Sequence, residues 1–151
     1  MATKAKIVKG EGPKSAKIVL LGECPGKTEI KLGRPFVGRA GKFLDKELKK
    51  FGFDRKKLYI TNVVKESHAG PPTPAKVKKY LPMLKRELHS LKQAKIIVLL
   101  GKTASRNVPL DLDATYIELP HPSAAMRFTK QKMKFEFVMK VLKRNLKSYL
   151  R

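Results

Sequence analysis

The sequence has 151 residues, of which 35 are Lys or Arg and 12 are Asp or Glu, so its formal net charge at pH 7 is +23. A chain of this length fits one domain that buries roughly 70% of the surface exposed by the unfolded chain. Its one cysteine, Cys24, excludes an intramolecular disulfide, a multi-cysteine zinc site and a four-cysteine iron–sulfur cluster, and its apolar runs are too short for a membrane span.

The charge excess points to a polyanionic partner. A surface this basic repels itself unless anions neutralise it. The phosphates of nucleic acid do so, because they bind Lys and Arg side chains and release their counterions to the solvent. A solvated, lysine-rich surface is the competing interpretation, because proteins from hot habitats are also rich in Lys, but these usually gain Glu as well. Acidic residues are scarce here, so we favour nucleic acid, while the low Asn, Gln and Cys content favours a thermophilic source.

The N-terminal residues 1–14 hold four lysines and little apolar pattern, so we expect a basic arm there and a single domain over residues 15–151. Apolar, β-branched runs then predict four strands, at 17–21, 58–64, 94–100 and 114–119. Apolar residues at helical spacing predict helices at 43–51, 73–91 and 135–146, and a short helix begins at Gly101. Pro82 falls inside the second of these and is expected to kink or divide it.

Strands that alternate with helices predict a three-layer α/β/α fold with a central four-stranded parallel sheet. Ligands bind at the carboxyl ends of the strands in such sheets. Polar and Gly/Pro-rich segments follow all four predicted strands, at 22–41, 62–73, 101–105 and 121–127. We therefore expect the functional site at this edge.

The segment after the first strand offers a close approach to a ligand. Gly22 begins a Gly/Pro loop whose backbone carries few side chains, although a simple tight turn explains it equally well. Phe36 follows in a loop bounded by Gly33 and Gly38. Its ring would either stack on a planar base or anchor the loop in the core.

The segment after the fourth strand combines a histidine with groups that suit a duplex groove. His121 alone is explained most simply as a capping or surface residue, but Ser123 offers a hydroxyl, Met126 an apolar wedge and Arg127 a cation within one short loop.

The tripeptide at 101–103 (GKT) resembles the end of a Walker phosphate loop. Ile96 stands where that motif requires its first glycine, so we reject nucleotide hydrolysis. The backbone amides here remain suitable for a DNA phosphate.

Taken together, these segments resemble the uracil-DNA glycosylase superfamily, and most of all its family 4. The matching stretches, in the family's order, are GECPGKTE (22–29), GRPFVGRAGKFLD (33–45), YITNVVK (59–65), PTP (72–74), IIVLLGKTA (96–104) and HPSAAMR (121–127). The resemblance implies an enzyme that removes uracil from DNA. Two alternatives stay open: a glycosylase for hypoxanthine or another deaminated base, and a basic DNA-binding homologue without catalysis.

The chain departs from family 4 at the cysteines that hold its iron–sulfur cluster. The first pair has no counterpart in residues 1–21, and Glu66 and Tyr80 stand about where the second pair falls. We therefore expect neither a metal nor another cofactor. Cys24 takes the position of a catalytic Asp in a related loop, and we favour a small filler over a nucleophile because nothing nearby in the sequence activates the thiol.

The resemblance also assigns roles to individual residues. His121 would donate a hydrogen bond to uracil O2, Asn62 would read the N3–O4 edge, and Phe36 would stack on the flipped base. Glu29 is the expected water-activating carboxylate, with Glu23 as its competitor.

The remaining assignments concern the walls of the pocket and the DNA strand. Gly22 and Cys24 would help to line the base pocket. Lys102, Ser123 and Arg127 would bind phosphates, and Met126 would fill the gap that the flipped nucleotide leaves in the duplex. We expect a monomer in the prokaryotic cytoplasm, associated with the nucleoid, with DNA as its partner and no membrane.

Overall fold

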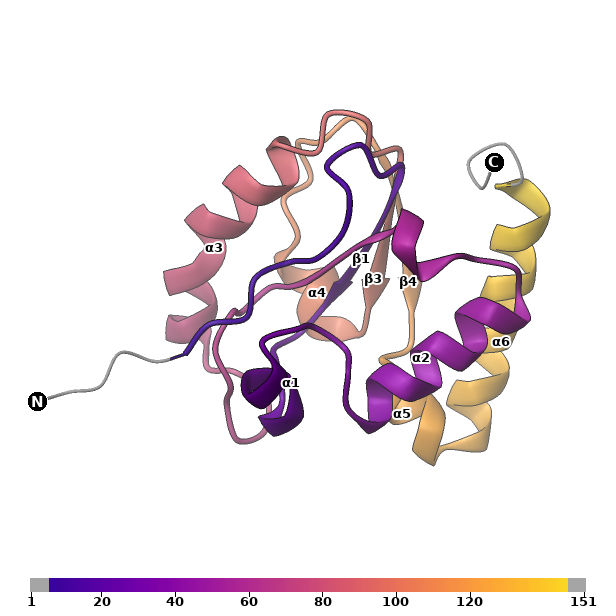
Figure 1. Ribbon diagram of the computed structural model, residues 1–151, viewed down its shortest axis with the longest axis horizontal. Helices are drawn as coiled ribbons and strands as arrows, with labels where there is room; N and C mark the ends of the chain where they lie inside the picture. Colours follow the sequence, from indigo (N-terminus) through magenta and orange to yellow (C-terminus); the bar gives the residue numbers. More distant parts are fainter. Residues whose placement is uncertain (1–5, 147–151) are drawn as a thin grey trace, which may run out of the picture.

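The computed structural model describes residues 6–146 and has a sheet between two layers of helices (Figure 1). The strands are β1 (Ile18–Gly22), β2 (Tyr59–Asn62), β3 (Ile96–Leu100) and β4 (Thr115–Leu119). All pairings are parallel and the strand order is β2-β1-β3-β4. The predicted three-layer fold and its four strands are confirmed.

Helices cover both faces of the sheet. They are α1 (Lys27–Leu32), α2 (Arg39–Lys50), the 3₁₀ turn η1 (Arg55–Lys57), α3 (Pro74–His89), α4 (Lys102–Asn107), α5 (Pro122–Arg127) and α6 (Thr129–Asn145). Figure 1 shows α3 on one side of the sheet and α2, α5 and α6 on the other. The sequence analysis missed α1 and α5, which have six residues each.

The core follows from the alternation of side chains along the strands. Ile18 and Leu20 of β1 belong to a cluster that includes residues of α2 and α6, whereas Val19 and Leu21 belong to a second cluster with residues of α3. Because β1 and β3 are buried on both faces, their sequences are continuous apolar runs.

The N-terminal segment is a correction to the sequence analysis. An arm is predicted over residues 1–14, but Ile7 forms an antiparallel bridge with Glu66 and Glu11 forms one with Ile60. Val8 is buried and its N–H donates to the Lys65 carbonyl at 2.8 Å, while Glu11 and Ile60 exchange two backbone hydrogen bonds of 2.8 Å each. The edge of β2 that faces away from β1, and the segment that follows β2, provide these partners. Residues 1–5 lie outside the described residues.

Helix α3 continues through Pro82 without being divided, which excludes one of the two outcomes expected for this proline. The Thr73 hydroxyl caps its start by accepting from the N–H of Lys76 at 3.2 Å. Pro82 is exposed, so water can bind the carbonyl that its missing N–H leaves free, and the buried face of α3 keeps the helix on the sheet. No helix within residues 6–146 is long and apolar enough to span a bilayer.

Candidate active site

A cavity of about 180 Å³ lies at the carboxyl edge of the sheet, near the point where the chain order reverses between β1 and β3. Its lining consists of Cys24, Gly26, Glu29, Phe36, Ala40, Gly41, Asn62 and His121. Five of these were singled out from the sequence. Four separate segments of the chain therefore meet in what we call the base pocket.

Phe36 forms one wall of the base pocket. Its side chain is 6% exposed, and its ring centroid lies 6.0 Å from that of His121, with an interplanar angle of 34°. Gly22 makes this packing possible, because a Cβ there would collide with the Phe36 ring and with Oδ1 of Asn62. A Cβ at Gly41 would collide with the backbone of Phe36. Gly22 is thus not one of the residues that line the base pocket, but its lack of a side chain makes room for two that do.

Asn62 ends β2 and is 3% exposed. Within residues 6–146, its Oδ1 is buried and has no hydrogen-bond partner. A buried acceptor without a partner is costly, so a ligand that donates a hydrogen bond there would be favoured.

Lys65 binds the backbone of Asn62 and does not itself line the base pocket. Its buried Nζ donates to the Asn62 carbonyl at 2.5 Å, to Oγ1 of Thr61 at 2.7 Å and to Oε1 of Glu87 at 2.6 Å. Burial lowers the pKa of Lys65, and Glu87 opposes this shift. The ion pair thereby holds the end of β2 rigid.

His121 caps α5 and its hydrogen bonds define its tautomer. The backbone N–H of Ser123 donates to Nδ1 at 3.1 Å, and the Ser123 hydroxyl lies 2.8 Å from the same nitrogen. Since Nδ1 accepts, the proton of the neutral ring is on Nε2. Burial lowers the pKa of His121, although the charge of Glu23 opposes this. The ring is therefore neutral at pH 7, with an N–H donor on Nε2.

The two candidate carboxylates have different surroundings. Oε1 of Glu29 accepts from the N–H of Gly26 at 3.0 Å, and Oε2 accepts from the N–H groups of Val37 at 2.9 Å and Gly38 at 2.6 Å. Glu29 thus links the starts of α1 and α2 while it lines the base pocket. Oε2 of Glu23 accepts from the Thr103 hydroxyl at 2.5 Å.

Cys24 lines the pocket without the properties of a nucleophile. Burial raises the pKa of its thiol to about 11, and the neighbouring Glu23 contributes to the increase. The thiol is therefore protonated at neutral pH, which fits a small filler.

The residues expected to bind DNA belong to the two short helices that follow β3 and β4. Lys102 begins α4, and Met126 and Arg127 end α5; all three are exposed. The Ser123 hydroxyl is instead engaged with His121. A second cavity of about 510 Å³ shares His121 with the base pocket and is also lined by Lys102 and by Lys134 of α6.

The positions expected for two cluster cysteines do not fit an iron–sulfur cluster. The Tyr80 hydroxyl donates to Oε2 of Glu66 at 2.9 Å, and Lys76 Nζ lies 2.9 Å from Oε1 of the same carboxylate. Within residues 6–146 no group of three or more His, Cys, Asp or Glu side chains is arranged to hold a metal ion. Hydrogen bonds occupy this region in place of thiolate ligands.

Sequence reasoning missed several residues around the pocket. Arg55, 19 residues from Phe36 along the chain, binds the carbonyl of that residue, and Thr103 binds Glu23 across 80 residues. No local pattern signals such contacts. The Ser123 contact with His121 had a local signal, since the two residues are only two positions apart at a helix start.

Comparison with known proteins shows which family the chain is similar to. The family model for the uracil DNA glycosylase superfamily matches residues 9–144. The Type-4 uracil-DNA glycosylase of Archaeoglobus fulgidus is 40% identical over 119 residues, which are 76% of this chain and 59% of that protein. The protein of the same name from Sulfurisphaera tokodaii is 38% identical over 108 residues, covering 70% and 49% of the two chains.

Further similarities extend the comparison. The Thermotoga maritima protein of that name is 50% identical over 62 residues, covering 41% of this chain and 32% of its own. The chain thus spans about half the length of the curated relatives it matches. A solution NMR structure from Methanosarcina acetivorans, provisionally assigned as a uracil DNA glycosylase, aligns with a TM-score of 0.51 at 13% identity, over 91% of this chain and 98% of the other. This last likeness shows the fold.

Proposed function

The chain belongs to the uracil DNA glycosylase superfamily, and from this premise we propose that it is a monofunctional uracil-DNA glycosylase. It would flip uracil out of DNA, hydrolyse the N-glycosidic bond and leave an abasic site for base-excision repair. The observation that carries the proposal is a single base-sized cavity lined by Phe36, Asn62 and His121.

Recognition of the base would rest on Asn62. Uracil presents an N3–H donor beside the O4 acceptor, which complement the side-chain oxygen and NH₂ of an asparagine. Support comes from the buried Oδ1 of Asn62, which has no partner within residues 6–146 and would accept from N3–H. Cytosine offers an acceptor at N3 and a donor at N4, so both contacts would be repulsive. Phe36 would stack on the face of the bound uracil.

Stabilisation of the departing base would rest on His121. Breaking the glycosidic bond leaves negative charge on the uracil ring, and a fixed donor aimed at that charge is worth most where water is excluded. The hydrogen bonds from Ser123 to Nδ1 support this role, because they leave the proton on Nε2. A neutral imidazole can then donate to O2 without giving up its proton.

Orientation of the attacking water would rest on Glu29. It lines the base pocket, and its Oε1 accepts only one hydrogen bond within the described part of the chain, so a lone pair remains for a water molecule. The Glu23 carboxylate is bound to Thr103 and is not among the residues that line the pocket. We therefore retain Glu29 for this step, with Glu23 as its competitor.

Binding of the DNA strand would use the rim of the site. Lys102, which shares a cavity with His121, and the exposed Arg127 would bind phosphates. Met126, 37% exposed, would fill the gap left by the flipped nucleotide. The net charge of +23 supports this polyanionic partner. We propose that the protein acts as a monomer and without a metal or organic cofactor.

One assay tests the proposed function against its alternatives. Oligonucleotides that carry one uracil, one hypoxanthine or no lesion are incubated with the protein, in single and double strands, and then treated with alkali to break them at abasic sites. Breakage at uracil alone is the expected result. Breakage at hypoxanthine, whose N1–H and O6 offer Asn62 the same donor and acceptor, would shift the specificity to that base. Tight binding without breakage would indicate a non-catalytic DNA-binding protein.

A further inference from the structure

Phe36 has an unusual backbone conformation. Its φ of 52° lies in the left-handed region, and no other non-glycine residue described between 6 and 146 has a positive φ. Residues with a Cβ rarely adopt this conformation, which persists only where the surroundings hold it. The orientation of the Phe36 ring therefore depends on contacts made to its backbone.

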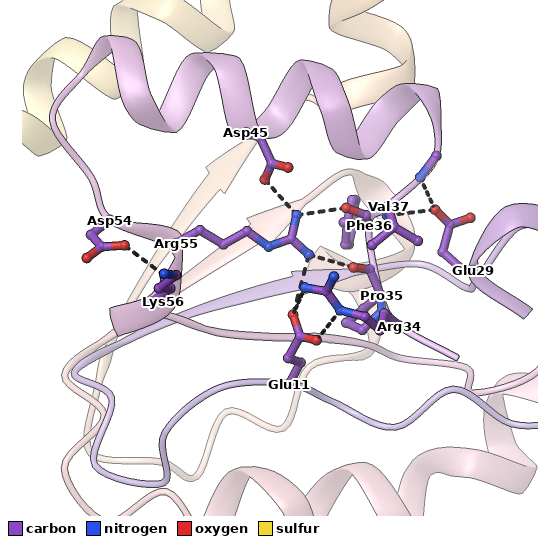
Figure 2. Close-up of polar contacts among 11 residues, drawn as sticks. Glu11, Glu29, Arg34, Pro35, Phe36, Val37, Asp45, Asp54, Arg55 and Lys56 are labelled. Carbon is purple, nitrogen blue, oxygen red and sulfur yellow. Dashed lines mark hydrogen bonds and ion pairs between the residues drawn. The ribbon is translucent and has the colours of Figure 1, made fainter. Parts of the chain in front are cut away.

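Arg55 makes two of these contacts. Its Nη2 donates to the Pro35 carbonyl at 2.6 Å and its Nη1 donates to the Phe36 carbonyl at 2.7 Å, as Figure 2 shows. The guanidinium group thus holds two consecutive peptide groups at once.

Glu29 completes the restraint on the C-terminal side of Phe36. Its Oε2 accepts from the next two backbone N–H groups, those of Val37 and Gly38. Figure 2 shows the loop between Arg55 and Glu29. Arg55 therefore holds the carbonyls of Pro35 and Phe36 while Glu29 holds the two amides that follow, so the peptide group between Phe36 and Val37 is bound at both its C=O and its N–H.

Arg55 is itself held in place by acidic residues. Its Nη1 lies 2.6 Å from Oδ1 of Asp45 and its Nη2 lies 3.7 Å from Oε2 of Glu11. The side chain is only 17% exposed. Each terminal nitrogen thus faces one backbone carbonyl and one carboxylate. A lysine, with one nitrogen in place of the planar fork, cannot reproduce this arrangement.

We propose that Arg55 is a positioning residue for base recognition, which it serves by holding Phe36 in its left-handed conformation. This inference rests on the proposed function, because Phe36 is the ring that would stack on uracil. Arg55 does not line the base pocket and instead lines a separate cavity on the side of Glu11 and Asp45. Its effect on excision would therefore pass through Phe36.

The test compares Arg55→Lys with Arg34→Gln, a matched control from the same cluster. Arg34 binds Glu11 at 2.6 and 3.0 Å and, within residues 6–146, its side chain makes no hydrogen bond to a loop carbonyl. Under single-turnover conditions, excision of uracil from a U·G duplex should fall about tenfold in Arg55→Lys and stay within about twofold of the parent in Arg34→Gln. A parental rate in Arg55→Lys would overturn the proposal.

A double-mutant cycle separates positioning from a general loss of stability. In a Phe36→Ala background, Arg55→Lys should cause little further decrease in rate, because the ring through which it acts is absent. Decreases that multiply would overturn the proposal. Asp45→Asn is a second variant should Arg55→Lys fail to fold; it keeps Arg55 but removes one anchor, and should reduce the rate in the same direction but less.

Amide hydrogen exchange tests the restraint independently of excision. The N–H groups of Val37 and Gly38 should exchange faster in Arg55→Lys than in the parent, because the loop between the two restraints loosens. Unchanged exchange would overturn the proposal even if the parent excises uracil. If the parent excises no uracil but exchange still responds, the proposed function fails and the positioning of Phe36 stands.

Discussion

The Tyr80 hydroxyl donates a 2.9 Å hydrogen bond to Oε2 of Glu66, and these two residues stand about where family 4 would place two cluster cysteines. The same carboxylate faces Lys76 at 2.9 Å and Lys79 at 3.7 Å. A set of ordinary polar interactions thus connects the segment after β2 to α3. With one cysteine in the whole chain, the purified protein should contain no iron–sulfur cluster, and iron analysis checks this directly.

Tyr80→Phe should lower the free energy of unfolding. Glu66 is buried, so removal of the hydroxyl takes a hydrogen bond from a poorly hydrated carboxylate and should cost about 2 kcal/mol. Urea denaturation provides the measurement. Tyr116→Phe is the matched control, because its hydroxyl donates to the neutral carbonyl of Pro109 at 2.6 Å and its loss should cost about 1 kcal/mol. Equal losses would contradict a special contribution from Glu66.

The same carboxylate should make stability depend on pH. The hydrogen bond from Lys76, and to a lesser extent the one from Tyr80, holds the pKa of Glu66 below its ordinary value of 4.5. A depressed folded-state pKa contributes stability that is complete above pH 4.5 and is lost as the pH falls through the lower, folded value. Urea midpoints measured from pH 6 downward should therefore fall less steeply below about pH 4.5 in Glu66→Gln than in the parent. Parallel curves would exclude this contribution.

His121 provides a prediction for excision. His121→Ala should reduce the single-turnover rate by about 10² to 10³, because the donor to O2 is lost. Ser123→Ala should have a much smaller effect, because the backbone N–H of residue 123 still donates to Nδ1 and keeps the tautomer. A loss in Ser123→Ala as large as in His121→Ala would show that the hydroxyl does more than orient the ring.

The pH dependence of excision should follow the same imidazole. Burial lowers the pKa of His121 from its ordinary value of 6.5, so the ring is mostly neutral at pH 7 and above, where its contribution to the rate should be nearly constant. As the pH falls toward the lowered pKa, protonation of Nδ1 breaks the bond from the Ser123 N–H, and the rate should decline. Single-turnover rates between pH 5 and 8 test this, and a decline that begins above pH 7 would contradict the direction of the shift.

The sequence predicted the sheet well because its strands carry the strongest local signal. Ile96–Leu100 is an uninterrupted apolar run, and such runs are typical of parallel strands buried on both faces. By contrast, α1 has no buried residue, so no apolar periodicity marks it. The lysines of residues 1–14 led to the prediction of an arm. That prediction missed the pairing of Glu11 with Ile60, because this pairing depends on the free edge of β2 and not on a local pattern.

The pocket could be anticipated only in part. Asn62 is the last residue of β2 and His121 follows the end of β4. A parallel sheet collects its functional residues at this edge, so their meeting follows from topology. The position of Arg55 against Phe36 depends on how η1 packs beside the loop before α2, and no spacing rule reports such a contact. The sequence also suggested that Glu29 activates the water. It did not show that the Glu29 carboxylate accepts hydrogen bonds from three backbone amides.

Glu29→Gln should reduce excision much more than Glu23→Gln. Substitution of Glu29 removes the carboxylate nearest the proposed water and also turns an NH₂ group toward backbone N–H donors, so the rate should fall about 10² or more, whereas Glu23→Gln should lose less than about tenfold. Because both the water and the loop are affected, Glu29→Ala measured with and without added formate separates the two roles. Formate can replace a missing carboxylate at the water but not its covalent link to α1. If formate restores the rate of Glu29→Ala, water activation by the carboxylate is supported. If it does not, Glu29 only positions the loop. Parental rates in both Gln variants would exclude carboxylate catalysis altogether.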